Sequence, residues 1–182
     1  MTMQVIDNPN PARVTDDPAE MARSMRAVLG NFCTGVAVIT AQTERGPIGM
    51  TVQSLVSISM DPPLVMFSPQ KASKTWTALR EAKEFCANIL PEHRPELPVH
   101  FAKTPLYERF DTVAWEPGHT GAPVLEECLA FVECSIEQNI DAGDHEIVLG
   151  RVVDLGERVA GEPLLFFKGG FGSFTSIPRE KK

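Results

Sequence analysis

The feature that most constrains the fold is a succession of short apolar runs, each bounded by residues that favour turns. Val, Ile, Thr and Phe are frequent in these runs, and prolines such as those of Asp61-Pro62-Pro63 interrupt them. Runs of this length and composition are typical of β-strands. Many short strands with few helices predict a mainly β fold, a closed or nearly closed antiparallel β-barrel with peripheral helices. The expected strands cover residues 36–40, 51–59, 64–67, 85–90, 129–140, 146–155 and 164–167.

Two helices are expected beside these strands, and Pro91 opens a loop or a third, short helix that reaches His100 and Phe101. Asp17 is a favourable N-cap and Pro18 suits the first helical position, and apolar residues then recur at helical spacing. Ser73 is a candidate N-cap for a second helix over residues 74–83. The alternation of strands and helices is too poor for a doubly wound sheet.

The length of 182 residues fits one domain with a sizeable core. We expect a flexible N-terminal arm over residues 1–16, one domain over 17–177 and a short tail over 178–182. The N-terminal stretch is polar and lacks the apolar segment of a signal peptide. No run reaches the roughly 20 apolar residues that cross a bilayer. A cytoplasmic protein without membrane attachment is therefore expected.

Charge and cysteine usage narrow the functional classes. The formal net charge is -7, without a basic cluster, which argues against general nucleic-acid binding but leaves small phosphorylated ligands open. The four histidines lack the spacing of metal ligands, so no metal site is expected. Widely spaced cysteines are expected to be reduced and mostly buried. These are Cys33, Cys86, Cys128 and Cys134.

The first candidate for chemistry is the segment 49–54, Gly-Met-Thr-Val-Gln-Ser. A glycine that enters a strand lets a flat ligand approach the backbone, and Thr51, Gln53 and Ser54 add polar side chains. Residue types alone favour an ordinary strand start, so both interpretations stay open here.

A second candidate is the segment 68–76, which leads into the expected helix. Hydroxyl groups, Lys71, Lys74 and the free N–H groups at a helix start suit a phosphate, although a simple Ser73 cap with solvated lysines explains the same residues. No Rossmann or P-loop glycine pattern is present.

A third candidate is the turn Asp141-Ala142-Gly143-Asp144, followed by His145. A histidine at a turn-to-strand junction can orient a ligand carbonyl or donate a proton near neutral pH. A lone histidine more often has a structural role, so this interpretation too stays open from the residues alone.

Taken in order, these segments resemble the flavin reductase-like family, whose fold is an FMN-binding split barrel. The likeness runs from about residue 25 to residue 174 and rests on many collinear short motifs. The motifs are Thr34-Gly35-Val36, Gly49 to Ser54, Asp61 to Val65, Ser73-Lys74-Thr75, Asn88-Ile89-Leu90, Arg109-Phe110, Gly121-Ala122-Pro123, Ala142 to His145 with Gly150, Pro163 to Phe167 and Gly172-Ser173.

The resemblance implies a Greek-key antiparallel homodimer that uses FMN or FAD, with NADH or NADPH as hydride donor. It implies that His145, beside Asp144, faces the nicotinamide. The isoalloxazine would lie against Met50, Thr51, Val52, Gln53 and Ser54. The ribityl chain and phosphate would be held by Ser68, Gln70, Ser73, Lys74 and Thr75. Phe101 and Lys103 would approach the cofactor from a helix, and Phe171 would cover the stacked rings.

The implied activity is NAD(P)H:flavin oxidoreduction by direct hydride transfer, which requires stacked rings and no metal or protein nucleophile. The reduced flavin would reach a partner monooxygenase through a transient complex or by diffusion. One alternative is a split-barrel protein that binds flavin tightly for electron transfer or for reduction of a ferric or organic acceptor. Another is a β-barrel interaction module without flavin.

Overall fold

The computed structural model describes residues 16–177. The expected arm over residues 1–16, except for Asp16, and the expected tail over 178–182 lie outside the described residues. No helix within this part of the chain is long and apolar enough to cross a membrane.

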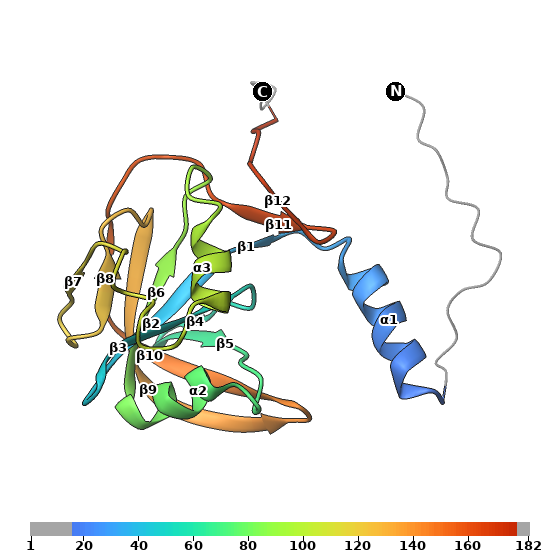
Figure 1. The fold of residues 1–182 in the computed structure, drawn as a ribbon, viewed down its shortest axis with the longest axis horizontal. Coiled ribbons are helices and arrows are strands. Elements are labelled where there is room, and N and C mark those ends of the chain that lie inside the picture. The colour runs from blue at the N-terminus through green and yellow to red at the C-terminus, as the bar shows by residue number, and fades with distance from the viewer. Residues whose placement is uncertain (1–15, 178–182) are drawn as a thin grey trace.

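A seven-stranded antiparallel sheet forms the centre of the fold, in the order β3-β2-β6-β9-β10-β5-β4 (Figure 1). Its strands are β2 (Ala37–Thr43), β3 (Gly46–Val52), β4 (Val56–Met60), β5 (Pro63–Phe67), β6 (Glu84–Ile89), β9 (Ala130–Ala142) and β10 (His145–Glu157). The mainly β prediction is confirmed. Strands β3 and β4 are the ends of the order, and no ladder joins them among the described residues. The hydrogen-bonded sheet is therefore open, which corrects the expectation of a closed barrel.

Three short helical segments and one longer helix accompany the sheet. These are α1 (Pro18–Leu29), α2 (Lys74–Leu79), the 3-10 turn η1 (Arg80–Ala82) and α3 (Leu97–Lys103). The predicted caps are confirmed: Asp17 accepts a hydrogen bond from the Ala19 amide at 2.9 Å, and Ser73 accepts one from the Trp76 amide at 3.2 Å. The second helix is α-helical only from Lys74 to Leu79 and continues as η1 to Ala82. Lys83 then adopts a left-handed conformation with φ 63° and ends the helical segment.

Two small sheets lie outside the main one. A three-stranded sheet contains β1 (Thr34–Gly35), β11 (Leu165–Phe167) and β12 (Gly170–Gly172), and a hairpin contains β7 (Trp115–Pro117) and β8 (Pro123–Leu125). Buried polar side chains hold the β7–β8 hairpin to the main sheet. Thr40 donates a hydrogen bond to the Pro123 carbonyl at 2.5 Å, and Asn88 accepts one from the Leu125 amide at 2.8 Å.

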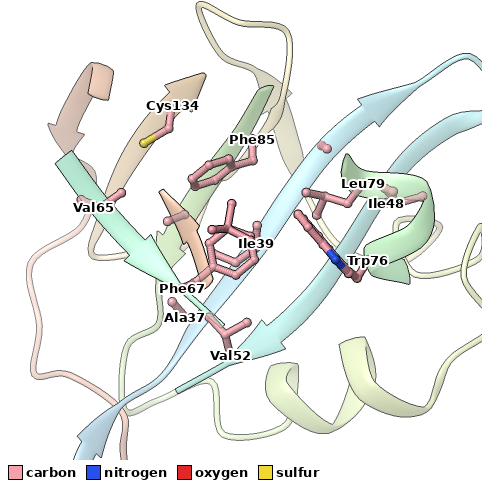
Figure 2. Close-up of a cluster of buried hydrophobic side chains, with 13 residues drawn as sticks. Ala37, Ile39, Ile48, Val52, Val65, Phe67, Trp76, Leu79, Phe85 and Cys134 are labelled. Atoms are coloured by element: carbon pink, nitrogen blue, oxygen red, sulfur yellow. The ribbon is translucent and has the colours of Figure 1, made fainter. Parts of the chain in front are cut away.

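Both faces of the sheet are covered by a buried cluster. Successive residues of a strand point to opposite faces, so a strand such as β2 contributes to both clusters. In β2, Ala37 and Ile39 face one cluster with Trp76 of α2 (Figure 2). Val38 faces the other cluster, which includes Phe101 of α3. Helices α2 and α3 therefore cover opposite faces, and both contact β3 at the edge of the sheet.

Helix α1 differs from the other helices in its packing. None of its residues is buried, and Figure 1 shows it (blue) projecting away from the main sheet. Its apolar side chains remain open to solvent, with Met25 at 52%, Val28 at 62% and Leu29 at 59% exposure. The chain thus forms the predicted helix, but its apolar face has no partner within the described part of the chain.

Candidate functional site

A cavity of about 470 Å³ lies where β3 gives way to β4. The sequence predicts one strand over residues 51–59, but the structure divides this run into β3 and β4 with residues 53–55 between them. Residues 53–55 are therefore outside the regular strand pairing. The walls of the cavity are formed by Met50, Thr51, Val52, Gln53, Ser54, Ser68, Pro69, Gln70, Ser73 and His145.

Two segments of the cavity wall are joined directly to each other. The Ser68 amide donates a hydrogen bond to the Ser54 hydroxyl at 2.8 Å. The Thr51 hydroxyl donates to the Pro98 carbonyl at 2.9 Å, which ties β3 to the start of α3. These bonds fix the spacing between the end of β3 and the loop 68–73, so the cavity is formed by connected backbone segments.

The tip of the β9–β10 hairpin closes the cavity from a third side. Backbone amides of Lys71 and Glu146 donate to the carbonyls of Asp144 and Pro69, each at 3.0 Å. The Ser68 hydroxyl donates to the Glu146 carbonyl at 2.8 Å. Residue His145 is thereby held against the loop 68–73 by bonds on both sides of it in the chain.

His145 and Asp144 form a pair at this tip. The Nδ1 atom of His145 lies 2.8 Å from Oδ1 of Asp144. The hydrogen bond from His145, and then the charge of its ring, hold the pKa of Asp144 below the usual range of a carboxyl group. The carboxylate therefore stays ionised at neutral pH and favours the tautomer with a proton on Nδ1.

A lysine clasp joins the loop 68–73 to the hairpin. Nζ of Lys71 lies 2.5 Å from Oδ2 of Asp141 and 2.6 Å from the Gly143 carbonyl oxygen. The hydrogen bond from Lys71, and then its charge, lower the pKa of Asp141. Lys71 is thus engaged by an acidic group, whereas Lys74 is exposed at the start of α2.

Behind the cavity wall, the side chain of Arg109 connects three segments. Its Nη1 donates to the Gly49 carbonyl at 2.5 Å and to the Thr75 hydroxyl at 2.9 Å, and its Nε donates to the Thr104 carbonyl at 2.9 Å. Arg109 is only 9% exposed and Thr75 only 6%. Burial lowers the pKa of Arg109, and no ion pair involves it among residues 16–177.

Six predicted site residues are not among the walls of this cavity: Lys74, Thr75, Phe101, Lys103, Asp144 and Phe171. Phe101 is fully buried, and a Cβ at Gly49 would lie 2.8 Å from its ring, so glycine is required for this close approach. Lys103 is exposed at the end of α3. Phe171 in β12 packs edge-on against Phe166, with ring centroids 5.6 Å apart.

A second cavity of about 1220 Å³ adjoins the first. The two cavities share Gln53 and His145 as wall residues. Asp144, Phe166 and the side of α1 that contains Met25 also line the second cavity. His145 therefore stands between two spaces, as a residue that contacts two different ligands would.

Sequence reasoning did not single out Pro69 or Arg109 as site residues. Pro69 supplies an apolar wall and the carbonyl that fixes Glu146. The position of Arg109 depends on contacts with residues 60 and 34 positions earlier in the chain. The sequence singled out Arg109 only within the motif Arg109-Phe110, to which the resemblance gave no role in the site.

The sequence is similar to a protein family and to several reductases. A family model for the flavin reductase like domain matches residues 29–175. The chain is 39% identical over 162 residues to the reductase subunit HsaB of a flavin-dependent monooxygenase from Mycobacterium tuberculosis, with 87% of this chain and 84% of HsaB covered. It is 44% identical over 156 residues to the FMN reductase (NADH) SmoA of Agrobacterium fabrum, with coverages of 86% and 88%.

A solved structure agrees with these relatives. The NADH:FAD oxidoreductase SgcE6 of Streptomyces globisporus superimposes with a TM-score of 0.81 at 34% identity. The superposition covers 95% of this chain and 98% of SgcE6. The family match includes every wall residue of the first cavity, and the chain therefore belongs to the flavin reductase-like family.

Proposed function

We propose that this protein is an NAD(P)H:flavin oxidoreductase that reduces FMN or FAD and supplies the reduced flavin to a partner monooxygenase. The observation that carries the proposal is His145 between two adjoining cavities, one of them walled by residues 50–54 and 68–73. The names of SmoA and SgcE6 support NADH as the donor and both FMN and FAD as acceptors. The name of HsaB supports a monooxygenase partner. We propose that the reduced flavin reaches this partner through a transient complex or by diffusion.

The first cavity fits a flavin in size and in chemistry. Its volume of about 470 Å³ lies within the usual range of small-molecule sites. Met50, Val52 and Pro69 offer apolar contacts to a ring system, and Gln53 offers an amide to its polar edge. The hydroxyls of Thr51 and Ser68 already donate within the protein, so they would meet the ligand as acceptors.

The other end of the same cavity suits the ribityl chain and phosphate. Ser73 and Gln70 lie in its wall, and Lys74 and Thr75 follow directly in the chain. In this arrangement Phe101 would support the ring side from beneath Gly49. Lys103 and Phe171 would act only at the margins, Lys103 as an exposed charge and Phe171 by backing Phe166 in the second cavity.

A bound flavin would supply the acceptor for the hydride of a reduced nicotinamide, and the protein's residues would align the two. His145 lies at the border of both cavities, where its ring can contact the nicotinamide side. With a proton on Nδ1 shared with Asp144, its Nε2 can accept a hydrogen bond from the nucleotide's amide. Asp144 fixes the orientation of this ring, and the backbone bonds around residue 145 fix its position.

We further propose that two chains form a split-barrel homodimer with Greek-key connections. The support is the unpartnered apolar face of α1, together with the second cavity that α1 lines. A second copy that covers this face would remove the exposed Met25, Val28 and Leu29 side chains from water. The second cavity would then be completed by both chains.

Absorbance at 340 nm tests the activity, with purified protein, NADH or NADPH, and added FMN, FAD or riboflavin. Saturable nucleotide oxidation that depends on added flavin is the expected result. Flavin that binds firmly without nucleotide oxidation would contradict the reductase and favour electron transfer. Absence of both binding and oxidation would contradict any flavin function.

A further inference from the structure

The geometry points to Arg109 as a positioning residue for the flavin phosphate, acting through the hydroxyl of Thr75. This inference rests on the proposed function, because it concerns the same site. It goes beyond that function by assigning a role to a buried cation that does not line the cavity. Three features of the described residues support it.

The first feature is a buried positive charge without a carboxylate partner. Arg109 is 9% exposed, and its hydrogen bonds go to the Gly49 and Thr104 carbonyls and to the Thr75 hydroxyl. Burial of a charge is costly, and buried arginines are usually paired with an acid. A cation kept beside neutral acceptors leaves its charge available to an anion that enters the site.

The second feature is an unused donor on Thr75. Its oxygen accepts the N–H of Arg109 at 2.9 Å, and its own proton has no acceptor among residues 16–177. Thr75 is only 6% exposed, and a nearly buried hydroxyl normally uses its proton. A hydroxyl that accepts from a guanidinium is polarised and becomes a stronger donor. Phosphate oxygens accept hydrogen bonds and donate none when ionised, so they match this donor.

The third feature is the location of the two anchored groups. Thr75 is not itself a wall residue, but it lies two residues after the wall residue Ser73, and Gly49 directly precedes the wall residue Met50. One guanidinium therefore connects the chain segments that begin both walls. His100 fixes Arg109 in turn, with Nε2 2.6 Å from the Arg109 carbonyl oxygen.

The test compares FMN with riboflavin, which has no phosphate, by quenching of flavin fluorescence on binding. The variants are Thr75→Val, Thr75→Ser and Arg109→Gln, with Arg158→Gln as a matched control, since Arg158 pairs with Glu116 outside the site. Thr75→Val should reduce the preference for FMN over riboflavin by about tenfold or more. Thr75→Ser keeps the hydroxyl and should retain the preference, as should Arg158→Gln.

The double variant Arg109→Gln with Thr75→Val separates action through Thr75 from general effects. Arg109→Gln alone should reduce the FMN preference, but it should have no further effect once Thr75 is valine. Equal losses for both flavins, or an undiminished effect of Arg109→Gln in the Thr75→Val background, would overturn the inference. If Arg109→Gln does not fold, an unchanged FMN preference in Thr75→Val overturns it alone.

Binding without turnover separates this inference from the proposed function. Wild-type protein that prefers FMN to riboflavin through Thr75 but does not oxidise NADH would contradict the reductase and support the phosphate role. Normal flavin-dependent oxidation with an unchanged preference in Thr75→Val would contradict only the role of Arg109.

Discussion

At the residue scale, the role proposed for His145 can be tested separately from flavin binding. His145→Ala should lower kcat for NADH oxidation by about tenfold or more, because it removes the ring that we propose orients the nicotinamide. Flavin affinity should change much less, since nine other residues also line that cavity. Stopped-flow reduction and flavin titration measure the two effects. His93→Ala, at an exposed position, is the control, and a His145→Ala rate equal to wild type would remove His145 from the mechanism.

The buried thiols predict how stability depends on pH. Burial raises the pKa of Cys128 from 9.0 to about 11, and burial together with the charge of Glu133 raises that of Cys134 to about 12. Between pH 9.0 and the raised pKa of each thiol, the folded chain keeps a proton that the unfolded chain releases. Stability is therefore complete below pH 9 and is lost as the pH rises, by up to about 1.4 kcal/mol per pH unit for each thiol.

Urea unfolding at pH 8 and pH 10 measures this alkaline loss. Cys134→Ala should be less stable at both values but should lose less stability between them, because one of the titrating groups is absent. Cys33→Ala changes an exposed thiol and should lose as much as wild type. Equal losses for Cys134→Ala and wild type would rule out Cys134 as a source of the pH dependence.

At the element scale, the clasp of Lys71 with Asp141 holds the β9–β10 hairpin against the loop 68–73. Lys71→Met should weaken flavin binding by roughly fivefold, because an exposed pair of this kind contributes at most about 1 kcal/mol. The melting temperature should hardly change. Arg151→Met is the matched control, since Arg151 pairs with Glu137 on the same two strands at 2.7 Å, outside the cavity wall. Equal flavin affinities in both variants would exclude the clasp from ligand binding.

The sequence predicted the helices whose start depends on residues adjacent in the chain, such as N-caps. Asp17 and Pro18 placed the start of α1 correctly, and Ser73 placed the start of α2. The β7–β8 hairpin was missed because its three-residue strands are held by Thr40 and Asn88, both distant in sequence. The break between β3 and β4 was missed because apolar residues recur at every second position on both sides of it, and only Ser54 and Leu55 depart from that pattern.

In the candidate site too, residues in short sequence motifs were predicted, and residues placed by contacts distant in sequence were not. Residues 50–54, Ser68, Gln70, Ser73 and His145 were predicted through resemblance and line one cavity, whereas Lys74 and Thr75 from the same prediction do not line it. Residues alone left each segment with an ordinary structural explanation. Arg109 was not assigned a role, because its contacts join β3, α2 and the end of α3, and such a convergence has no local pattern.

At the scale of the whole molecule, α1 predicts the state of assembly. Val28→Asp should weaken a homodimer at least about 100-fold, because a charge replaces an apolar side chain that would be buried between chains. Light scattering during size-exclusion chromatography measures the change. Arg23→Gln, on the same helix, is the control and should leave the mass unchanged. A wild-type chain that elutes as a monomer at all concentrations would contradict the dimer.

The open sheet has a consequence for the protein without its ligand. Strand β3 is an edge, and unpaired edges are templates that recruit other chains into aggregates. Here α2 and α3 contact part of that edge, and its last residues line the first cavity. A flavin ring bound there would cover this part of the edge and block pairing with the strand of another chain. The protein would then aggregate more slowly when it is saturated with flavin than without it.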